Sequence, residues 1–219
     1  MPHVSNYLFW FIPIASAFPF LASLTIFIQA PRQSYLKYFA LFLLVNFLLD
    51  LATSYSAWKG TDDVWLSNLD SVVVISFYLF LLREIVKSKK AKKVLLIFVL
   101  AYPIVSVINI FLFQRLPLLF PMTFTSGGVL IVITSIYYFW ETFQQKNSVN
   151  LIREPAFWIC SGLLFYFTCT FPLNGLLNFV SALPQVIVQN LFQIFIILNI
   201  FLYLSFTIAY LCRLKVKSI

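Results

Sequence analysis

Charged side chains are scarce in this chain of 219 residues. Only 10% of the residues are charged, whereas 62% are hydrophobic. A soluble domain usually carries about 25% charged and about 45–50% apolar residues. So few charges cannot cover a surface exposed to water, which excludes a soluble globular fold. Because no polar block is long enough to fold separately, we expect a single domain over residues 1–219.

Histidine and cysteine are also scarce. The single histidine, His3, precedes the first apolar run, which excludes a histidine-based metal or haem site, or a Ser–His or Cys–His nucleophile pair, within the membrane. The three cysteines, Cys160, Cys169 and Cys212, lie inside apolar runs, where we expect neither a disulfide framework nor a zinc site. The last apolar run, 186–212, lacks the lysine that a covalently bound retinal needs. We therefore predict no cofactor and no metal, and the sequence does not favour an enzyme.

Long apolar runs are what the sequence has in abundance. A transmembrane helix needs roughly 20 apolar residues, and the runs of suitable length are 7–29, 38–58, 64–82, 94–114, 117–140, 156–178 and 186–212. The uncharged stretch 155–212 is too long for one crossing, so we expect turn signals to divide it into two helices. These signals are Pro172, Asn174-Gly175 and Pro184. The sequence predicts an all-α, polytopic membrane protein with a single bundle of seven transmembrane helices.

The basic residues predict the orientation of this bundle. Thirteen of the fifteen Lys and Arg residues lie in connections on one side, and only Lys59 and Arg115 lie on the other. Cytoplasmic loops carry the excess of Lys and Arg in membrane proteins. We therefore expect a multi-pass protein of the cell (inner) membrane, with its N-terminus outside and its C-terminus in the cytoplasm. The net charge of +8 then indicates orientation and not a nucleic-acid partner.

One predicted cytoplasmic loop, 83–93, holds six of these basic residues. They are Arg83, Lys87, Lys89, Lys90, Lys92 and Lys93. The simplest role of this loop is to set the orientation. The alternative is a binding platform for anionic lipid or for an acidic cytoplasmic protein, in addition to the contact of the helices with the lipid bilayer.

Asp50 and Asp70 are carboxyl groups inside predicted membrane spans. A carboxylate there costs roughly 2.5–3.5 kcal/mol on insertion scales, so such residues usually face the bundle interior. Asp50 lies about 12 Å, and Asp70 about 9 Å, from the outer end of its helix. If the two groups are close, we expect them to share a proton or attract a cation. The structural alternative is that each is hydrogen-bonded to a neighbouring helix or stays hydrated near the interface.

Uncharged polar residues at similar depth complete the predicted ligand- or ion-binding site. They are Asn68, Asn109, Thr123, Thr170, Gln189 and Gln193. Hydrogen bonds between helices, worth about 0.6 kcal/mol each, would explain any one of them. Their shared depth on several helices predicts a polar pocket open to the outside.

Three kinds of function fit these features. The first is a receptor-like sensor or binding module for a small ligand, acting with a cytoplasmic or membrane partner. The second is a small proton- or cation-coupled transporter that uses Asp50 and Asp70, with Asn46, Asn199 and Tyr203 among the residues that would continue its path inward. The third is a structural subunit of a membrane complex. A lipid enzyme with the two aspartates as acid and base ranks last, because no nucleophile or metal ligand accompanies them.

Overall fold

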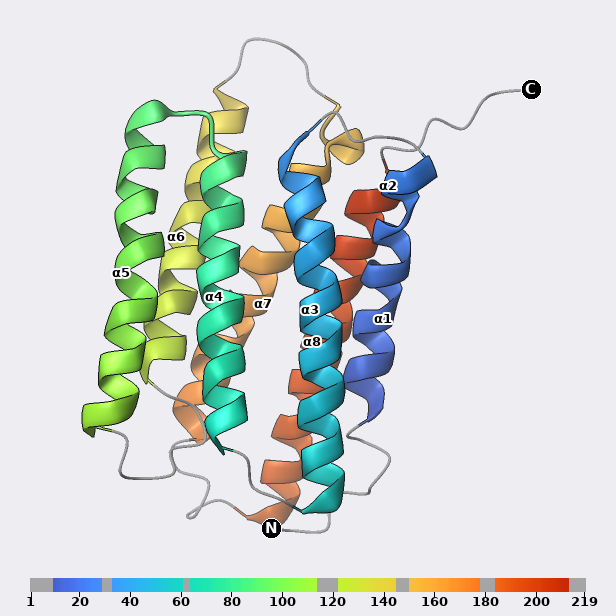
Figure 1. Cartoon of the computed structure of the whole chain (residues 1–219), viewed down its shortest axis with the longest axis vertical. Helices are drawn as coiled ribbons and strands as arrows, with labels where there is room; N and C mark the ends of the chain where they lie inside the picture. Colours follow the sequence, from blue (N-terminus) through green and yellow to red (C-terminus); the bar gives the residue numbers. More distant parts are fainter. Residues whose placement is uncertain are drawn as a thin grey trace.

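The structure of this chain, a computed structural model, describes residues 10–28, 33–60, 64–113, 122–144, 150–177 and 184–212. Every element within these ranges is a helix, which confirms the prediction of an all-α chain for this part of the protein. The helices are α1 (Phe11–Ser23), α2 (Thr25–Ile28), α3 (Tyr35–Lys59), α4 (Val64–Ile85), α5 (Lys89–Phe113), α6 (Met122–Phe143), the 3₁₀ turn η2 (Leu151–Arg153), α7 (Pro155–Leu177) and α8 (Gln185–Leu211). The long helices lie roughly side by side (Figure 1).

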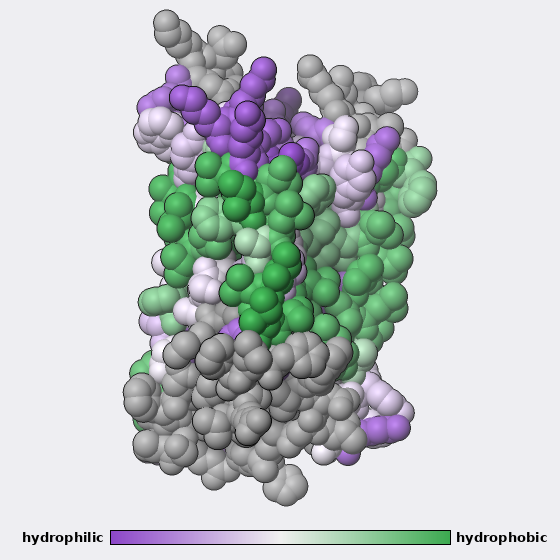
Figure 2. Space-filling view, turned by 60° about the vertical axis from the view of Figure 1, so that its left-hand side comes forward, coloured by the Kyte–Doolittle hydropathy of each residue, from purple (hydrophilic) through white to green (hydrophobic). Residues whose placement is uncertain are grey.

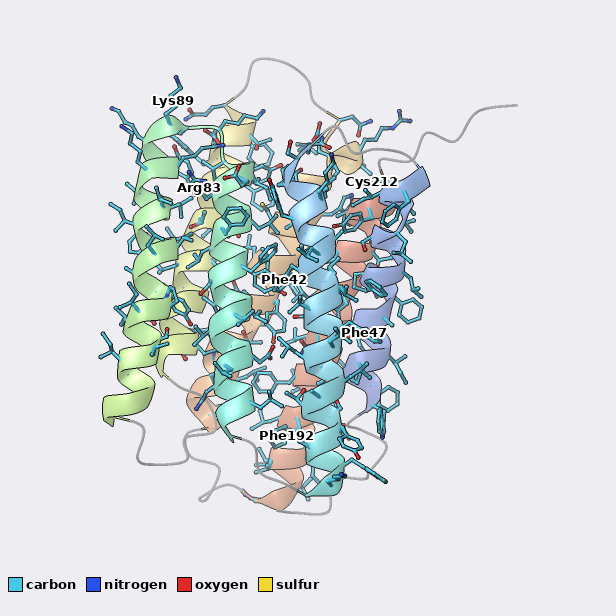
Figure 3. The ribbon with its side chains drawn as sticks, viewed as in Figure 1. Phe42, Phe47, Arg83, Lys89, Phe192 and Cys212 are labelled. Carbon is cyan, nitrogen blue, oxygen red and sulfur yellow. The ribbon has the colours of Figure 1, made fainter. Side chains whose placement is uncertain are left out.

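The connection between α4 and α5 is shorter than predicted. Helix α4 continues to Ile85 and α5 already begins at Lys89, so most of the expected loop 83–93 is helical. Ser88 caps α5, because its Oγ accepts a hydrogen bond from the backbone N–H of Ala91 at 3.5 Å. We call the end of the bundle that carries this connection the basic end. Figure 3 shows Arg83, Lys89 and Cys212 at this end.

The uncharged stretch 155–212 divides where the predicted spans 156–178 and 186–212 place the division, because α7 ends at Leu177 and α8 begins at Gln185. Of the three turn signals, however, only Pro184 lies between the two helices. Pro172, Asn174 and Gly175 all lie inside α7, which continues to Leu177. Proline removes one backbone hydrogen bond, a loss that a helix tolerates where neighbouring helices pack against it. Helix α7 packs against both α6 and α8, which supports it across Pro172.

The first helix also differs from its predicted span, 7–29. Helix α1 ends at Ser23, and the short α2 follows after a turn at Leu24. The N–H of Leu24 donates to the carbonyl oxygen of Leu21 at 3.1 Å, which is the tighter bonding of a 3₁₀-type turn. At the far end of α3, Gly60 adopts a φ of 73°, the left-handed conformation in which helices commonly end.

Five helices surround the interior of the bundle. The ring runs α3, α4, α6, α7, α8, with direct packing of α3 on α4, α4 on α6, α6 on α7 and α7 on α8. The hydrogen bond that Tyr203 of α8 donates to Asp50 of α3 closes it. Helix α1 packs outside against α3 and α8, and α5 packs outside against α4. In Figure 1 these two peripheral helices form opposite edges of the molecule.

The surface of the bundle is largely apolar. Figure 2 shows hydrophilic side chains gathered at the basic end above a broad hydrophobic band. Large apolar side chains of the bundle are well exposed, among them Phe143 at 70% and Ile97 at 65%. Four helical segments in the described part of the chain are long and apolar enough to cross a membrane, namely Tyr35–Lys59, Lys89–Asn109, Pro155–Leu176 and Val186–Leu211. This combination is typical of a membrane protein.

Aromatic rings fill the interior of the ring toward the basic end. The rings of Phe42 and Phe77 stack with centroids 3.9 Å apart, and Phe39 meets Phe206 edge to face at 4.9 Å. Tyr210 stacks on Phe39 and donates a hydrogen bond to the carbonyl oxygen of Leu36. Figure 3 shows Phe42 between α3 and α4. We call Phe39, Phe42, Phe77, Phe206 and Tyr210 the aromatic cluster.

Candidate functional site

A cavity of about 90 Å³ lies inside the five-helix ring, and both Asp50 and Asp70 line it. We call it the carboxyl cavity. Its other polar lining residues are Asn46, Ser71, Tyr78, Tyr166, Asn199 and Tyr203, and its apolar ones are Val74, Phe124, Phe167 and Leu202. All five helices of the ring contribute to this lining. A site assembled from so many elements depends on the packing of the whole bundle.

One oxygen of Asp50 accepts two hydrogen bonds inside the bundle. The hydroxyl of Tyr203 donates to Oδ2 at 2.8 Å, and Nδ2 of Asn46 donates to the same atom at 3.0 Å. Asn46 also donates to the Tyr203 hydroxyl oxygen at 3.1 Å. Asn46 and Asp50 are four residues apart on α3, so their side chains share one face of the helix. The expectation that Asp50 is hydrogen-bonded to a neighbouring helix is met, and the bond lies within the carboxyl cavity.

Asp70 has an oxygen whose hydrogen-bonding capacity is not used. Its Oδ1 is buried and accepts no hydrogen bond from any group in the described part of the protein. A buried polar atom without a partner costs about 1–3 kcal/mol. Asp70 lines the same cavity as Asp50, so its carboxyl group borders any guest placed there.

The cavity can hold a small cationic group. No Lys or Arg lines it in the described part of the chain, so two carboxyl groups face it without a compensating positive charge. A dry cavity of about 150 Å³ admits benzene, so a volume of about 90 Å³ suits a smaller guest. A primary ammonium group or a partly hydrated monovalent cation has a suitable size and charge. Three or more His, Cys, Asp or Glu side chains do not converge anywhere in the described residues.

Some predicted site residues lie away from the carboxyl cavity. Asn109 belongs to α5, which packs outside the ring. On α8, Gln193 is exposed and Gln189 is half-buried, and neither lines the cavity. Asn68 is half-buried on α4, one helical turn or less from Asp70, but it is not part of the lining. The side chain of Thr123 lies outside the described part of the structure.

Other residues line the carboxyl cavity although they were not among the predicted ligand-binding residues. Asn46, Asn199 and Tyr203, which we considered as an inward path for a transporter, line the same cavity as the aspartates. Toward the basic end the aromatic cluster follows them. Sequence reasoning did not single out Tyr166 and Ser71. Ser71 adjoins Asp70, and Tyr166 lies one turn before Thr170 on α7, so these spacings were the available signal.

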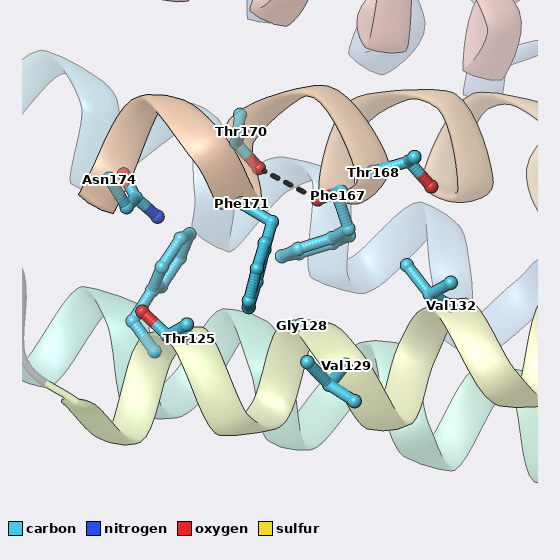
Figure 4. A pocket seen from close by; sticks show the side chains of 10 residues that line it. Thr125, Gly128, Val129, Val132, Phe167, Thr168, Thr170, Phe171 and Asn174 are labelled. Carbon is cyan, nitrogen blue, oxygen red and sulfur yellow. Dashed lines mark hydrogen bonds between the residues drawn. The ribbon is translucent and has the colours of Figure 1, made fainter. Parts of the chain in front are cut away.

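Thr170 lines a second pocket, a groove of about 210 Å³ between α6 and α7 (Figure 4). Thr170 is buried, and its hydroxyl donates to the carbonyl oxygen of Phe167 at 3.4 Å. The remaining lining is mostly apolar and includes Gly128, Val129 and Phe171. We call this pocket the α6–α7 groove. It shares two lining residues with the carboxyl cavity, Phe124 and Phe167.

The predicted lipid- or partner-binding residues gather at the basic end. Arg83 forms an ion pair with Glu84, and Nζ of Lys92 donates to the carbonyl oxygen of Glu84 at 3.4 Å. The backbone N–H of Lys87 donates to Oε2 of Glu141 at 2.8 Å, which ties the α4–α5 connection to α6. The side chains of Lys87, Lys89, Lys90 and Lys93 are exposed. They form a basic surface away from the carboxyl cavity.

The carboxyl cavity is therefore the strongest candidate for a functional site. It is enclosed by five helices and holds two carboxyl groups, one of them with a buried oxygen that no described protein group satisfies. The basic surface and the α6–α7 groove are separate features of the same bundle. No family model, no curated protein and no solved structure matches this chain, so its function is inferred from the geometry of these sites.

Proposed function

We propose that this protein is a receptor-like binding protein of the cell membrane that holds a small cationic ligand in the carboxyl cavity. One observation carries the proposal: Asp50 and Asp70, from adjacent helices, line one interior cavity that no described Lys or Arg shares. Membrane proteins place carboxyl groups in the bilayer at a cost, and such groups commonly mark ligand or ion sites.

The proposal includes seven transmembrane helices with the basic end in the cytoplasm. Helix α1 continued by α2, helix α4 and helix α6 would span the membrane beside the four segments that are apolar enough by themselves. The lysines in the first turns of α5 support this orientation. A helix N-terminus favours anions, by about 0.3–1 kcal/mol each, so Lys89 and Lys90 do not serve to stabilise α5. Their position agrees with the cytoplasmic excess of basic residues.

The interior of the bundle supports binding of a cationic ligand better than it supports transport of a cation across the membrane. The polar lining of the carboxyl cavity ends where the aromatic cluster begins, with Phe42 stacked on Phe77 at 3.9 Å. A conducting path for a cation would have to continue through these rings, which offer no hydrogen-bond acceptor comparable to a carboxylate. The exposed lysines at the basic end are then the surface for an anionic lipid or an acidic cytoplasmic partner that receives the signal.

Methylammonium is a suitable probe for the carboxyl cavity, because it is a small primary ammonium ion. We expect methylammonium chloride to stabilise the purified protein against unfolding by about 1.4 kcal/mol at ten times its Kd. Choline chloride at the same concentration controls for ionic strength, since its head group is too bulky for a cavity of about 90 Å³. The measurement is the unfolding midpoint in detergent micelles.

Substitutions of the two aspartates test whether methylammonium binds in the carboxyl cavity. Asp50→Asn and Asp70→Asn keep the shape of each side chain and remove its charge, so the double variant should lose the stabilisation by methylammonium. Glu141→Gln is the matched control, because it removes a carboxylate at the basic end that bonds the Lys87 amide and lies outside the cavity. An unchanged effect of methylammonium on the double variant would contradict the proposal. Asp70-dependent acidification of proteoliposomes, followed with a pH-sensitive dye, would favour a coupled transporter instead.

A further inference from the structure

The α6–α7 groove and the carboxyl cavity are neighbours that share two aromatic lining residues. Phe124 of α6 and Phe167 of α7 each line both pockets, and their ring centroids are 5.8 Å apart in a tilted arrangement. Phe167 is 3% exposed. These two side chains are therefore the partition between an apolar groove on the side of the bundle and the carboxyl groups within it.

The absence of a side chain at Gly128 allows the Phe167 ring to occupy this position. A Cβ atom at Gly128 would lie 2.8 Å from Cδ1 of Phe167, closer than such atoms approach in proteins. The missing side chain therefore lets the ring lie directly against the backbone of α6. Figure 4 shows Phe167 and Phe171 projecting from α7 toward α6 beside Gly128. The barrier between the two pockets is thus made of side chains and not of helix backbone.

The groove itself has room for an alkyl chain. Its volume of about 210 Å³ exceeds the roughly 150 Å³ of a cavity that admits benzene, and Val129, Val132 and Phe171 make its walls apolar. Asn174 adds a polar side chain to this lining, and the residue is only 3% exposed.

We propose that the α6–α7 groove admits an amphipathic alkylammonium ligand from the bilayer and holds its chain, while its ammonium group binds Asp50 and Asp70 behind Phe124 and Phe167. The inference rests on the proposed function, because it assigns the ligand class of the same carboxyl cavity. The charge of the two aspartates selects an ammonium head, and the apolar groove beside them selects a chain.

Displacement of radiolabelled methylammonium by octylammonium, with the protein in lipid nanodiscs, tests this route. Each buried methylene strengthens binding by about fourfold. Octylammonium should therefore displace the label at concentrations lower than unlabelled methylammonium does, by about tenfold or more. Partition of octylammonium into the lipid is the same for wild type and variants, so differences between proteins report the groove.

Tryptophan substitutions on each wall of the groove should remove this advantage. Val129→Trp and Thr168→Trp place an indole in the groove from α6 and from α7, and both positions are exposed, so each variant can fold even if the other does not. We expect both to bind methylammonium as wild type does and to lose the preference for octylammonium. Ile133→Trp is the matched control, because Ile133 is an exposed residue of α6 that does not line the groove.

The outcomes separate the two proposals. If both groove variants keep the wild-type preference for octylammonium, or if Ile133→Trp loses it equally, the lateral route is wrong, whatever methylammonium does. If methylammonium does not bind wild type at all, the proposed function fails and the route fails with it. If octylammonium still displaces methylammonium after Asp50→Asn and Asp70→Asn are combined, the head group does not bind the aspartates and the inference is overturned.

Discussion

At the scale of single residues, the carboxyl cavity depends on hydrogen bonds that join α3 to α8. Tyr203 and Asn46 both donate to Oδ2 of Asp50, and Asn46 also reaches the Tyr203 hydroxyl. A second α8–α3 bond lies nearer the basic end, where the Tyr210 hydroxyl donates to the carbonyl oxygen of Leu36 at 2.9 Å. The two tyrosines therefore make similar contacts between the same helices, but only Tyr203 touches a carboxylate of the cavity.

This difference predicts energetic coupling at one tyrosine only. Tyr203→Phe combined with Asp50→Asn should show a coupling free energy of about 0.5–1.5 kcal/mol, because the two residues are in direct contact. Tyr210→Phe combined with Asp50→Asn should be additive within about 0.3–0.5 kcal/mol. The free energies of unfolding of the single and double variants in mixed micelles give both values. Additivity at Tyr203 would mean that the hydrogen bond to Asp50 contributes nothing to stability.

At the scale of helices, close approach is possible where a side chain is missing. Gly162 lies in α7 at its contact with α8, and a Cβ atom there would lie 2.8 Å from Cβ of Ser205. Gly175, on the same helix, has open space around the corresponding position. Helix α8 contributes three residues to the lining of the carboxyl cavity, namely Asn199, Leu202 and Tyr203. The spacing between α7 and α8 therefore also affects the shape of the cavity.

Alanine at these two glycines should therefore have opposite effects. Gly162→Ala forces α7 and α8 apart and should lower the free energy of unfolding by about 1–3 kcal/mol. Gly175→Ala meets no neighbour in the described part of the chain and should raise it, by up to about 1 kcal/mol, since alanine is the better helix former. Unfolding midpoints in the same detergent compare them. Equal destabilisation by both changes would contradict the close packing of α7 on α8.

At the scale of the whole molecule, each end of the bundle carries an exposed lysine that can report its side of the membrane. Lys90 is exposed at the basic end, and Lys59 is exposed at the opposite end of α3, where its Nζ lies 4.6 Å from the centroid of the Tyr55 ring. In the proposed orientation these lysines face opposite sides of the membrane.

Cysteine labelling tests this orientation. In a background without Cys160, Cys169 and Cys212, Lys59→Cys should react with a membrane-impermeant maleimide in intact cells. Lys90→Cys should react only after the membrane is permeabilised, because a charged reagent does not cross the bilayer. The cysteine-free chain measures the background. The reverse pattern would invert the topology, and labelling of both positions in intact cells would rule out separate sides.

The helices were predictable because the apolar runs are long, and the shared depth of Asp50 and Asp70 followed from simple spacing along two neighbouring helices. Single turn and loop signals were less reliable than the apolar runs. Pro172 lies inside α7 because packing against α6 and α8 outweighs the single hydrogen bond that proline removes. Helix α5 begins at Lys89 because Ser88 caps its N-terminus. The many charged residues of that segment predicted a loop instead.

The amino-acid sequence by itself determined that the chain is helical and apolar, and it singled out two carboxyl groups. Only the tertiary structure decided which helices surround the interior. It placed Asn109 on the peripheral helix α5 and exposed Gln193, while it turned Tyr166 and Asn199 toward the aspartates. The physical reason is that lipid and protein interior are both apolar, so hydrophobic patterning distinguishes the inward face of a membrane helix poorly. Side-chain packing and hydrogen bonds between helices determine which face of each helix turns inward. In this bundle Phe167 does so by packing and Tyr203 by its hydrogen bond to Asp50.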